Sequence, residues 1–568
     1  MSPSTVRPAT SGVPLPALGA LGDLTSRTGG APQAASRPAD ETLVTGVTLD
    51  SRSVLPGDLY AALPGFNVHG ARFAADAVRA GAVAVLTDAE GRALVEEAVA
   101  REGLDAVPVL VAADPRAVLG QAAATVYGRP SEGLTMIGIT GTNGKTTTAY
   151  LVESALRAHG SRTGLIGTVE TRIGEDRVES VRTTPEATDL HALLGVMRER
   201  GTDACVMEVS SHALELHRVD GVVYDVALFT NLSQDHLDFH PSMEAYFAAK
   251  ASLFTPERSR AGVVCVDDAW GARLAREAGV PVTTLSTLST LSTLSTTDAS
   301  EAADTAAHAA DWTVEDGDAG AFTLRERATG RGLALVSHLP GHFNVANTAL
   351  AALALLATGL TDAEVEAAMA VAPDVPGRME VVAAGGDGTP RCVVDFAHTP
   401  DAVDAALVAL RPSTQGRLIA VLGAGGDRDS GKRPAMGAAA ARRADVVVVT
   451  DDNPRSEDPA TIRAAVAEGA RAQVASGDAT ATLVIDGGAR SSAIAEAIAL
   501  AVVESGEQGE QGEQEGRVDT VVVLGKGHEK GQEILGVKHP FDDRDAVRAA
   551  LAAVTSTRRA TARPEVTA

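Results

Sequence analysis

The sequence predicts an α/β protein made of several domains with mainly parallel sheets. Its 568 residues exceed what one hydrophobic core usually serves, so about three or four domains are expected. Short apolar segments typical of buried strands alternate with helical patterns along most of the chain. One such segment, 136–140, runs into a glycine-rich turn that opens a helix. This order is typical of a doubly wound sheet, whose ligands bind at the carboxyl ends of the strands.

Composition and periodicity divide the chain into five segments. Residues 1–40, rich in Pro, Ser, Thr, Gly and Ala, predict a disordered tail. Residues 41–130 predict a small α/β domain, 131–375 a central domain that begins with the glycine-rich turn, and 376–553 a third, Rossmann-like domain. Residues 554–568 predict a second disordered tail.

Two repeats interrupt this alternation. Residues 284–296 repeat Thr-Leu-Ser, and residues 507–515 repeat an acidic Glu-Gln-Gly unit. We expect both to be exposed, dispensable loops and not functional sites, because their composition buries little apolar area.

Charge and hydropathy restrict the partners and the compartment. With 74 acidic residues against 49 basic ones, a net charge of −25 and no long basic patch, we expect no nucleic-acid partner. No apolar segment approaches about 20 residues and no signal peptide is evident, so no membrane insertion is expected. Cys205, Cys265 and Cys392 lie too far apart for metal-ligand spacing, which favours reduced thiols in a cytoplasmic protein.

The glycine-rich turn predicts a phosphate-binding loop, and hence ATP or GTP. Its glycines let backbone N–H groups face phosphate oxygens, and the helix N-terminus adds partial positive charge. Lys145 reaches the terminal phosphates, and the Thr146 hydroxyl is suited to Mg²⁺. The strict pattern places glycine where this chain has Ile139, so the loop has a narrower form. The predicted loop comprises Gly141, Thr142, Asn143, Gly144, Lys145, Thr146 and Thr147.

Ionisable side chains follow the next strands. Glu208 ends an apolar strand, where its carboxylate is a natural Mg²⁺ ligand. The strand at 225–229 leads into the polar segment 230–240, in which His236 is the leading candidate for a second metal site. Each has an ordinary alternative, namely a solvated acid and a hydrogen-bonded structural histidine. Lys250 lies in an apolar helical stretch, where a lysine ordinarily extends to solvent.

Taken together and in order, five motifs resemble the Mur ligase family of ATP-dependent amide-forming enzymes. The resemblance spans about residues 41–550. It implies a three-domain Mur ligase architecture with a central P-loop ATPase domain and a Rossmann-like C-terminal domain. The motifs are 141–147, 208–212, 231–240, 339–347 and 377–380.

The resemblance implies specific roles at the nucleotide and metal sites. In that family the lysine that matches Lys250 is carbamylated, and the resulting anion coordinates Mg²⁺. The resemblance further implies that Glu208 and His236 bind a second Mg²⁺, that Asn347 contacts adenine, and that Arg378 and Asp395 reach the ATP phosphates or ribose. The implied catalytic residues are Lys145, Glu208, His236 and Lys250, and the implied metal ligands are Thr146, Glu208, His236 and carbamylated Lys250.

Other matches concern a nucleotide-sugar substrate. The segment 47–52 looks like the uridine-diphosphate site of the tripeptide-forming members, with Ser51 near the nucleotide; the alternative is an ordinary capped turn. Leu216 departs from the pattern, since some relatives have glutamine there. The residues that match the muramoyl-dipeptide site are Thr183, Thr184, Ser210 and Arg218.

The third domain contains a motif that indicates which amino acid substrate the protein adds. Its segment 451–455, Asp-Asp-Asn-Pro-Arg, resembles the signature of members that add meso-diaminopimelate. Arg455, assisted by Arg428, suits the distal carboxylate, whereas Glu529 and the Gly525 carbonyl suit the distal ammonium. The alternative is an Asn-Pro turn with a surface arginine. Phe396 replaces a tyrosine of relatives, and we expect it to stack without a hydroxyl. The implied diaminopimelate-binding residues are Arg428, Asp452, Asn453, Pro454, Arg455, Gly525 and Glu529.

The resemblance implies one reaction of peptidoglycan precursor synthesis. ATP would phosphorylate the D-Glu γ-carboxylate of UDP-N-acetylmuramoyl-L-Ala-D-Glu, and meso-diaminopimelate would displace the phosphate, with Mg²⁺ as cofactor. We expect a monomer. The alternatives are the lysine-adding member, the D-alanyl-D-alanine-adding member, folylpolyglutamate synthase, and a catalytically silent nucleotide-binding scaffold of envelope synthesis.

Overall fold

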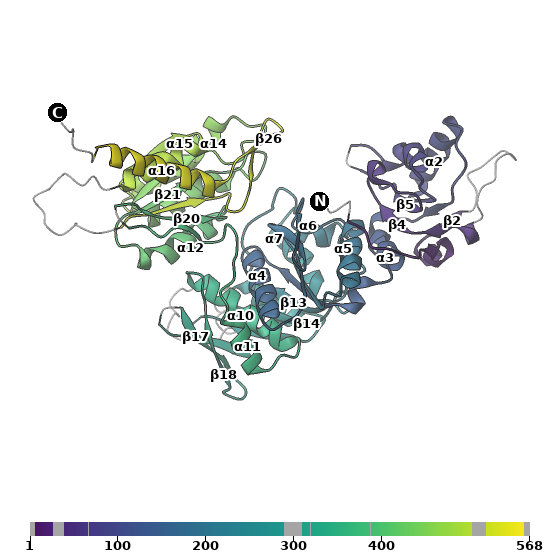
Figure 1. Ribbon diagram of the computed structural model, residues 1–568, viewed down its shortest axis with the longest axis horizontal. Helices are drawn as coiled ribbons and strands as arrows, with labels where there is room; N and C mark the ends of the chain where they lie inside the picture. The colour runs from purple at the N-terminus through teal and green to yellow at the C-terminus, as the bar shows by residue number, and fades with distance from the viewer. Residues whose placement is uncertain are drawn as a thin grey trace, which may run out of the picture.

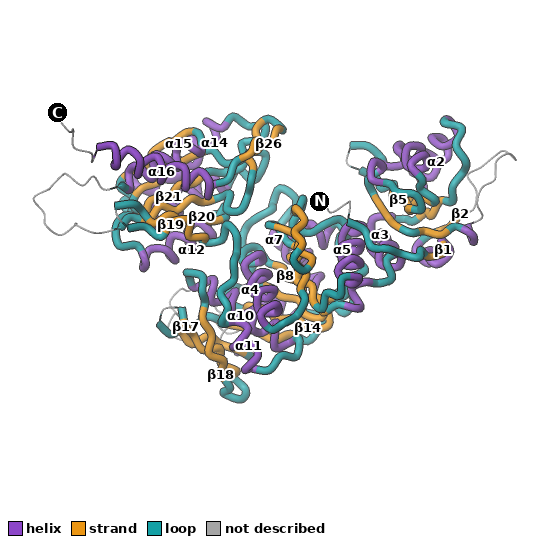
Figure 2. Tube along the Cα trace, viewed as in Figure 1, coloured by secondary structure: helices purple, strands orange, loops and turns teal. Residues whose placement is uncertain are grey.

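The computed structural model describes residues 6–25, 39–65, 67–288, 309–318, 320–386, 388–502 and 518–561. Three α/β domains follow one another along the chain, and the central one lies between the other two (Figure 1). In each domain helices pack around a central sheet, as Figure 2 shows. The predicted loop at 507–515 and most of the repeat at 284–296 lie outside the described residues.

The first domain is built on a small, mostly parallel sheet. Its elements are β2 (Asp23–Thr25), β4 (Gly46–Thr48), β5 (Asp58–Ala61), α1 (Ala74–Ala80), β6 (Ala84–Thr87), α2 (Ala89–Arg101), β7 (Val109–Val111) and α3 (Pro115–Val126). The sheet order is β2-β7-β6-β5-β4, with only β2 antiparallel to its neighbour. Helix α3 starts where the Asp114 carboxylate accepts two backbone N–H bonds and Pro115 takes the first helical position.

Residues 6–25 are structured, which differs from the prediction of a disordered tail. Strand β1 (Val13–Pro14) pairs with β3 (Leu43–Val44), and the 3₁₀ helix η2 (Leu15–Leu21) follows it. Leu15 and Leu18 lie one 3₁₀ turn apart and are fully buried in the core of the first domain. The surrounding Pro, Ala and Gly give this stretch a tail-like composition, so the prediction over 1–40 is wrong for residues 6–25.

The central domain has one large mixed sheet. Its strands are β8 (Thr135–Thr140), β9 (Thr163–Ile166), β10 (Glu170–Ile173), β11 (Asp176–Glu179), β12 (Ala204–Glu208), β13 (Tyr224–Phe229), β14 (Ser259–Cys265), β15 (Val282–Ser286), β16 (Trp312–Asp316), β17 (Ala321–Glu326) and β18 (Gly332–Val336). The order is β11-β10-β9-β12-β8-β13-β14-β15-β16-β17-β18. The central strands β9, β12, β8, β13, β14, β15 and β16 are parallel. Antiparallel strands form both edges, β10 and β11 at one and β17 and β18 at the other. The sheet therefore places the carboxyl ends of β8, β12 and β13 side by side.

Helices cover both faces of the central sheet. They are α4 (Lys145–Ala158), α5 (Ala187–Glu199), α6 (Ser211–Glu215), α7 (Met243–Ala251), α8 (Ala269–Glu277), α10 (His342–Ala357) and α11 (Asp362–Met369). Buried residues of α4, α10 and α11 form one core, and those of α5 to α8 form the other. Strand β8 is buried on both faces, which explains its continuous apolar sequence.

The start of the predicted repeat loop is a strand. Strand β15 runs parallel between β14 and β16, and Leu285 is fully buried. The Ser286 hydroxyl and the Thr287 N–H both donate to Oδ1 of Asp267 at 2.9 Å. The strand shares the Thr-Leu-Ser unit of the repeat, so composition alone does not distinguish it. The prediction of a loop over 284–296 is therefore wrong for residues 284–287.

The third domain has a doubly wound sheet. Its elements are β19 (Glu380–Ala383), β20 (Arg391–Asp395), α12 (Pro400–Leu410), β21 (Leu418–Leu422), α13 (Lys432–Arg443), β22 (Val446–Thr450), α14 (Pro459–Ser476), β23 (Leu483–Gly488), α15 (Arg490–Ala501), β24 (Thr520–Leu524), β25 (Gly531–Ile534), β26 (Val537–Pro540) and α16 (Asp543–Thr561). The order is β19-β20-β24-β21-β22-β23, with only β19 antiparallel. Helices α12 to α14 pack on one face, and α15 and α16 on the other.

The last helix differs from the prediction for the end of the chain. Helix α16 continues to Thr561, so the disorder expected over 554–568 is wrong for residues 554–561. None of the helices in the described ranges is long and apolar enough to cross a bilayer.

Candidate active site

The phosphate-binding loop joins β8 to α4 at the carboxyl edge of the central sheet. Gly141 (φ 147°) and Gly144 (φ 87°) adopt backbone conformations that favour glycine. A Cβ on Gly144 would lie 2.4 Å from Oδ1 of Asn347, so that position also needs glycine for space. The Lys145 ammonium donates to the carbonyls of Gly141 and Thr142 at 2.9 and 2.8 Å. The lysine thus folds over its own loop.

Neighbouring segments hold the rest of the loop in place. The Thr142 hydroxyl lies 3.1 Å from the Tyr246 hydroxyl, and the Asn143 N–H donates to Oδ1 of Asn231 at 3.0 Å. Thr147 is buried in the first turn of α4. The predicted loop is therefore one preformed site.

Glu208 is buried beside the loop. Its Oε2 accepts from the Thr146 hydroxyl at 2.9 Å, and its Oε1 accepts from the Thr168 N–H at 2.8 Å. The Thr168 hydroxyl also donates to Oε2, at 3.1 Å. A Cβ on Gly167 would lie 2.4 Å from Oε1. Sequence reasoning missed Thr168, because it lies far from Glu208 in the chain and outside the motifs.

His236 lies on the loop after β13, close to the cations of the site. Its Nε2 is 3.5 Å from Oδ2 of Asp235, and its ring centroid is 4.9 Å from that of His212. Partial burial and the charges of His212, Lys145 and Lys250 lower the pKa of His236, although Asp235 raises it. The imidazole is therefore neutral near pH 7, the state in which it can bind a metal.

Lys250 is buried and does not extend to solvent. Its side chain is 1% exposed, and Nζ donates to the Gly141 carbonyl at 2.7 Å. The ammonium lies 4.6 Å from the centre of the Tyr246 ring. Burial, and then the charge of Lys145, lower the pKa of Lys250 well below its usual value. A depressed pKa makes a neutral amine available in the site.

The third domain reaches the loop through Arg378. Its Nη2 donates to the Thr146 hydroxyl at 3.0 Å, and its guanidinium stacks 4.4 Å from the centre of the Phe396 ring. The expected stacking of Phe396 is confirmed in this contact. Buried Nε of Arg378 has no hydrogen-bond partner among the described residues, which fits a phosphate oxygen.

Asp395 and Asn347 make contacts within the protein. Asp395 accepts from the N–H groups of Met379 and Ala397, each at 2.8 Å, and so fixes the segment after Arg378. Asn347 accepts from the Thr148 hydroxyl at 3.2 Å and packs against Gly144. Asn347 therefore lies next to the loop that would hold ATP, whereas Asp395 supports the segment of Arg378 that reaches this loop.

The donor set at the loop fits Mg²⁺ in part. Glu208 and Thr146 offer oxygen ligands of the kind that Mg²⁺ prefers alongside phosphates and water. Over the ranges described, no three His, Cys, Asp or Glu side chains converge on one point as a complete protein metal site. One or two protein ligands plus substrate phosphates therefore suit this site better than an all-protein cage.

Three of the four residues predicted to hold the muramoyl-dipeptide cluster next to Glu208, and the fourth, Arg218, pairs with Glu186. The Thr184 hydroxyl donates to the Glu208 carbonyl at 2.9 Å, and the Ser210 N–H donates back to the Thr184 oxygen at 3.1 Å. Thr183 joins Thr168 through their hydroxyls at 3.0 Å. Arg218 Nε lies 3.0 Å from Oε1 of Glu186. Leu216, the position that departs from the pattern of relatives, caps the C-terminus of helix α6.

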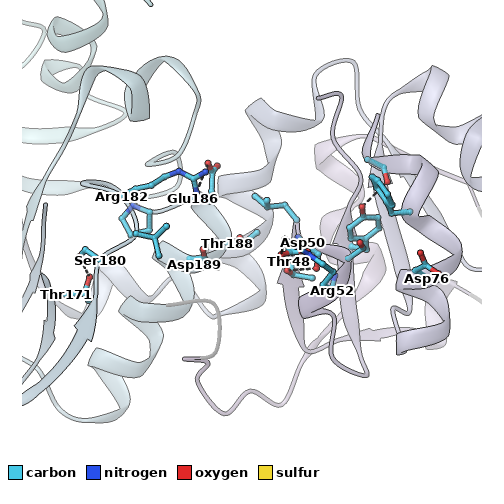
Figure 3. A pocket seen from close by; sticks show the side chains of 17 residues that line it. Thr48, Asp50, Arg52, Asp76, Thr171, Ser180, Arg182, Glu186, Thr188 and Asp189 are labelled. Atoms are coloured by element: carbon cyan, nitrogen blue, oxygen red, sulfur yellow. Dashed lines mark hydrogen bonds and ion pairs between the residues drawn. The ribbon is translucent and has the colours of Figure 1, made fainter. Parts of the chain in front are cut away.

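A first cavity of about 890 Å³ separates the first and central domains. Ser51, in the 3₁₀ helix η4 (Ser51–Ser53), lines it from one side, and Arg182 and Pro185, which flank Thr183 and Thr184, line it from the other. Figure 3 shows Asp50 and Arg52 facing Arg182 and Asp189 across this space. Burial raises the pKa of Asp189 to about 6. The cavity is large enough for a nucleotide-sized group.

A second cavity of about 220 Å³ lies between the central and third domains. The central domain contributes His212, Asp235 and His236, so the predicted metal ligand faces the third domain. The third domain contributes all but one of the residues predicted for diaminopimelate, and the exception is Pro454. Those lining residues are Arg428, Asp452, Asn453, Arg455, Gly525 and Glu529.

The predicted carboxylate-binding arginine is already engaged. Arg455 adopts a left-handed conformation (φ 51°), with Nη1 donating to the Gly426 carbonyl at 2.5 Å and Nε 3.3 Å from Oε2 of Glu533. Within the described part of the chain, no hydrogen bond or ion pair uses its Nη2. Arg428 lies 3.6 Å from Asp238 of the central domain. The Pro454 carbonyl accepts from the Glu457 N–H and fixes the turn.

Asp452 and Gly525, which line the same cavity as Arg455, lie against each other. A Cβ on Gly525 (φ 113°) would lie 2.6 Å from Oδ2 of Asp452, and that carboxylate is 3.7 Å from Arg490. The segments that follow β24 and β22 therefore meet at Gly525 and Asp452, although β21 lies between the two strands.

A P-loop domain between two α/β domains, with a cavity at each junction, defines a multidomain nucleotide-dependent enzyme. The chain belongs to the Mur ligase family. Residues 43–127 match the model of the Mur ligase family catalytic domain, residues 139–356 the Mur ligase middle domain, and residues 377–527 the Mur ligase glutamate ligase domain. The predicted family and its three-domain architecture are thereby confirmed.

Similar proteins cover almost the whole chain. UDP-N-acetylmuramoyl-L-alanyl-D-glutamate–2,6-diaminopimelate ligase of Streptomyces coelicolor is 52% identical over 519 residues, which cover 90% of this chain and 94% of that protein. The protein of the same name in Corynebacterium glutamicum is 47% identical over 515 residues, covering 90% and 92%.

Solved structures agree with this assignment. A ligase structure with that same name is 31% identical, with a TM-score of 0.59, and covers 92% of this chain and 98% of that chain. The D-alanyl-D-alanyl ligase of Acinetobacter baumannii, at 16% identity and a TM-score of 0.54 over 91% of this chain and 94% of that one, shares the fold.

Proposed function

We propose that this chain joins meso-diaminopimelate to the D-Glu γ-carboxylate of UDP-N-acetylmuramoyl-L-Ala-D-Glu at the expense of ATP, in cytoplasmic peptidoglycan precursor synthesis. The observation that carries the proposal is the second cavity. There the loop that bears His236 faces the segment that bears Arg455, so an amine held by the third domain would approach a carboxylate held by the central one. Relatives with the corresponding name support the choice of substrates.

The first step activates the carboxylate. A γ-carboxylate oxygen of the substrate attacks the γ-phosphorus of ATP, the bond to the β-phosphate oxygen breaks, and ADP leaves behind an acyl phosphate. Lys145 would exchange its two carbonyl contacts for phosphate oxygens, and the free Nε of Arg378 would add a donor from the third domain. Two Mg²⁺ ions, each held by one or two of the side chains Thr146, Glu208, His236 and carbamylated Lys250, would neutralise charge on the phosphoryl oxygens.

The second step forms the amide. The neutral amine of diaminopimelate adds to the acyl carbon, and the tetrahedral intermediate collapses with loss of phosphate and a proton. No side-chain nucleophile is required, so catalysis is mainly positioning and charge stabilisation. In this proposal Thr183, Thr184, Ser210 and Arg218 hold the dipeptide carboxylates by hydroxyl and guanidinium donors.

Two alternatives remain distinguishable. The lysine-adding reaction would leave Nη2 of Arg455 without a carboxylate partner, which costs free energy in a site closed to water. The ion pair with Glu533 and the partial exposure of Arg455 reduce this cost. A catalytically silent scaffold would not need Glu208 braced by Thr146 and Thr168, or Lys250 buried against the loop. Both observations favour an active diaminopimelate ligase.

The test compares diaminopimelate and L-lysine with the native protein and with Arg455→Ala. We expect native turnover to require diaminopimelate, and Arg455→Ala to lower its kcat/KM about a hundredfold, which is roughly 2.7 kcal/mol. Arg442→Ala, which changes an exposed arginine of the same domain, should match the native protein. Native preference for lysine, or unchanged turnover by Arg455→Ala, would contradict the proposed substrate.

A further inference from the structure

A buried lysine lies directly behind the proposed amino acid site. Lys526 follows β24, and its side chain is 0% exposed. Its Nζ donates to Oδ1 of Asn453 at 2.9 Å and to Oε2 of Glu529 at 2.7 Å. Both partners line the second cavity, whereas Lys526 does not. Because a buried ammonium is costly unless it is paired, these two partners account for its position.

The two partners are also joined to each other. Nδ2 of Asn453 donates to the same Oε2 of Glu529 at 2.9 Å, and Oδ1 of Asn453 accepts a second bond, from the Glu533 N–H, at 3.0 Å. Two donors therefore face Oδ1 and one acceptor faces Nδ2, which fixes the orientation of the amide. One ammonium thus closes a triangle of hydrogen bonds.

This triangle leaves one oxygen of Glu529 for a ligand. Oε2 receives both protein donors. For the residues that the structure describes, no hydrogen bond or ion pair uses Oε1. A carboxylate whose second oxygen is held in this way cannot rotate freely, so Oε1 keeps one position at the wall of the cavity.

We propose that Lys526 is a positioning residue for the amino acid substrate. Its ammonium holds Asn453 and Glu529 in one orientation, and Oε1 of Glu529 then receives the distal ammonium of that substrate. Lys526 acts through these two side chains and does not touch the substrate. The inference rests on the proposed function and deepens it, because it adds a residue that determines how tightly the amino acid is bound.

Lys526→Met tests this inference, because it removes the ammonium but keeps an unbranched buried side chain. We expect the KM for meso-diaminopimelate to rise at least tenfold, while the KM values for ATP and the nucleotide-sugar dipeptide stay within twofold of native. Lys526→Arg, which keeps a cation with several donors, should recover the KM to within about fivefold of native. Lys530→Met removes an exposed lysine of the same loop and should leave all three KM values unchanged.

A double-mutant cycle tests whether Lys526 acts through Glu529. In the Glu529→Gln background, Lys526→Met should raise the KM for diaminopimelate less than twofold further, because the side chain that it positions is already impaired. Full additivity of the two effects would overturn the proposal. So would Lys526→Arg that folds but binds as weakly as Lys526→Met.

Structural damage gives a different result from lost positioning. Loss of a cooperative melting transition in Lys526→Met, or a parallel rise of all three KM values, would overturn the proposal, since Lys526 would then mainly hold the domain together. The native protein in the same assays separates a failure of the proposed function from a failure of the role proposed for Lys526. If it does not use diaminopimelate, the proposed function fails; if it does and Lys526→Met has a native KM, only this inference fails.

Discussion

At the scale of single residues, the buried lysine of helix α7 has the properties that a carbamate requires. Carbamylation needs an unprotonated amine, and Lys250 has a depressed pKa because burial and Lys145 both disfavour its charge. The proposed carbamate would turn a cation next to Lys145 into an anion, which would relieve the repulsion between the two amines.

Lys250→Ala should therefore lose nearly all turnover, and short carboxylic acids should restore part of it by supplying the missing oxygens. The measurement is product formation by Lys250→Ala with increasing acetate or formate, together with ¹³C NMR of native protein in ¹³CO₂-enriched buffer. Lys538→Ala, on exposed β26, is the control and should not respond to either acid. Native activity of Lys250→Ala in CO₂-depleted buffer would rule out the metal role.

The residues that sequence reasoning identified share one property, which is that each lies within or beside a motif that neighbouring residues define. Lys145 and Thr146 are contiguous with the loop, and Glu208 stands at the end of an apolar strand. Thr168 and Lys526 were not identified, because each depends on a partner distant in the chain, which is Glu208 for Thr168 and Asn453 for Lys526. For Lys526 a signal did exist, namely a lysine two residues after the buried strand β24 and three residues before Glu529.

At the scale of elements, the described part of the Thr-Leu-Ser repeat, residues 284–288, contains both core strand residues and an exposed leucine. Leu285 is fully buried among strands β14 to β16, whereas Leu288 is 38% exposed. Leu285→Ala should lower the free energy of unfolding by about 2–4 kcal/mol, because it removes packing and leaves a cavity. Leu288→Ala is the matched control and should change it by about 0.5 kcal/mol or less. Urea denaturation measures both, and equal losses would contradict the strand assignment.

The N-terminal segment connects two domains. Arg7 pairs with buried Asp58 of the first domain at 2.6 Å, Val6 packs on the core of the central domain, and Pro8 lies against Gly195 of α5. A chain segment that touches both domains restricts how they move relative to one another, and so it bears on the first cavity.

Arg7→Ala should lower the free energy of unfolding by about 3 kcal/mol, because it leaves the buried Asp58 carboxylate without its partner. This value is at the lower end of the range for a broken buried pair, since the Arg7 side chain is 16% exposed. Differential scanning calorimetry would show the loss as a lower Tm of the first domain. Arg79→Ala, which breaks an exposed pair of similar length, should change the Tm little. If the two variants melt alike, the segment does not anchor the domain.

Periodicity predicts the elements with long apolar runs best. The parallel strands β8, β12, β13, β21, β22 and β24 are buried on both faces, so their sequences are distinctive. Short elements such as β1 and η2 were missed, because their few apolar residues contact partners distant in sequence. The repeat at 507–515 lies outside the described residues, and its dispensability stays a prediction.

At the scale of the whole molecule, a small number of polar contacts hold the third domain against the central one. Arg378 reaches Thr146, Lys432 lies 3.7 Å from Asp235, and Arg428 lies 3.6 Å from Asp238. These contacts join the nucleotide loop and the segment of His236 to the proposed amino acid site. They suggest that binding of ATP and closure of the third domain reinforce each other, since Arg378 would bind phosphate only when the domains are close.

Arg378→Ala should therefore favour a more open arrangement of domains and lower kcat at least tenfold, with a higher KM for ATP. Small-angle X-ray scattering with a non-hydrolysable ATP analogue measures the first effect, and we expect a larger radius of gyration than for native protein with the same ligand. Arg411→Ala, whose arginine pairs with Asp445 inside the third domain, is the control and should close normally. If Arg378→Ala closes as native protein does but loses turnover, the arginine contributes only to the chemistry. If neither quantity changes, the domains are held together by other contacts.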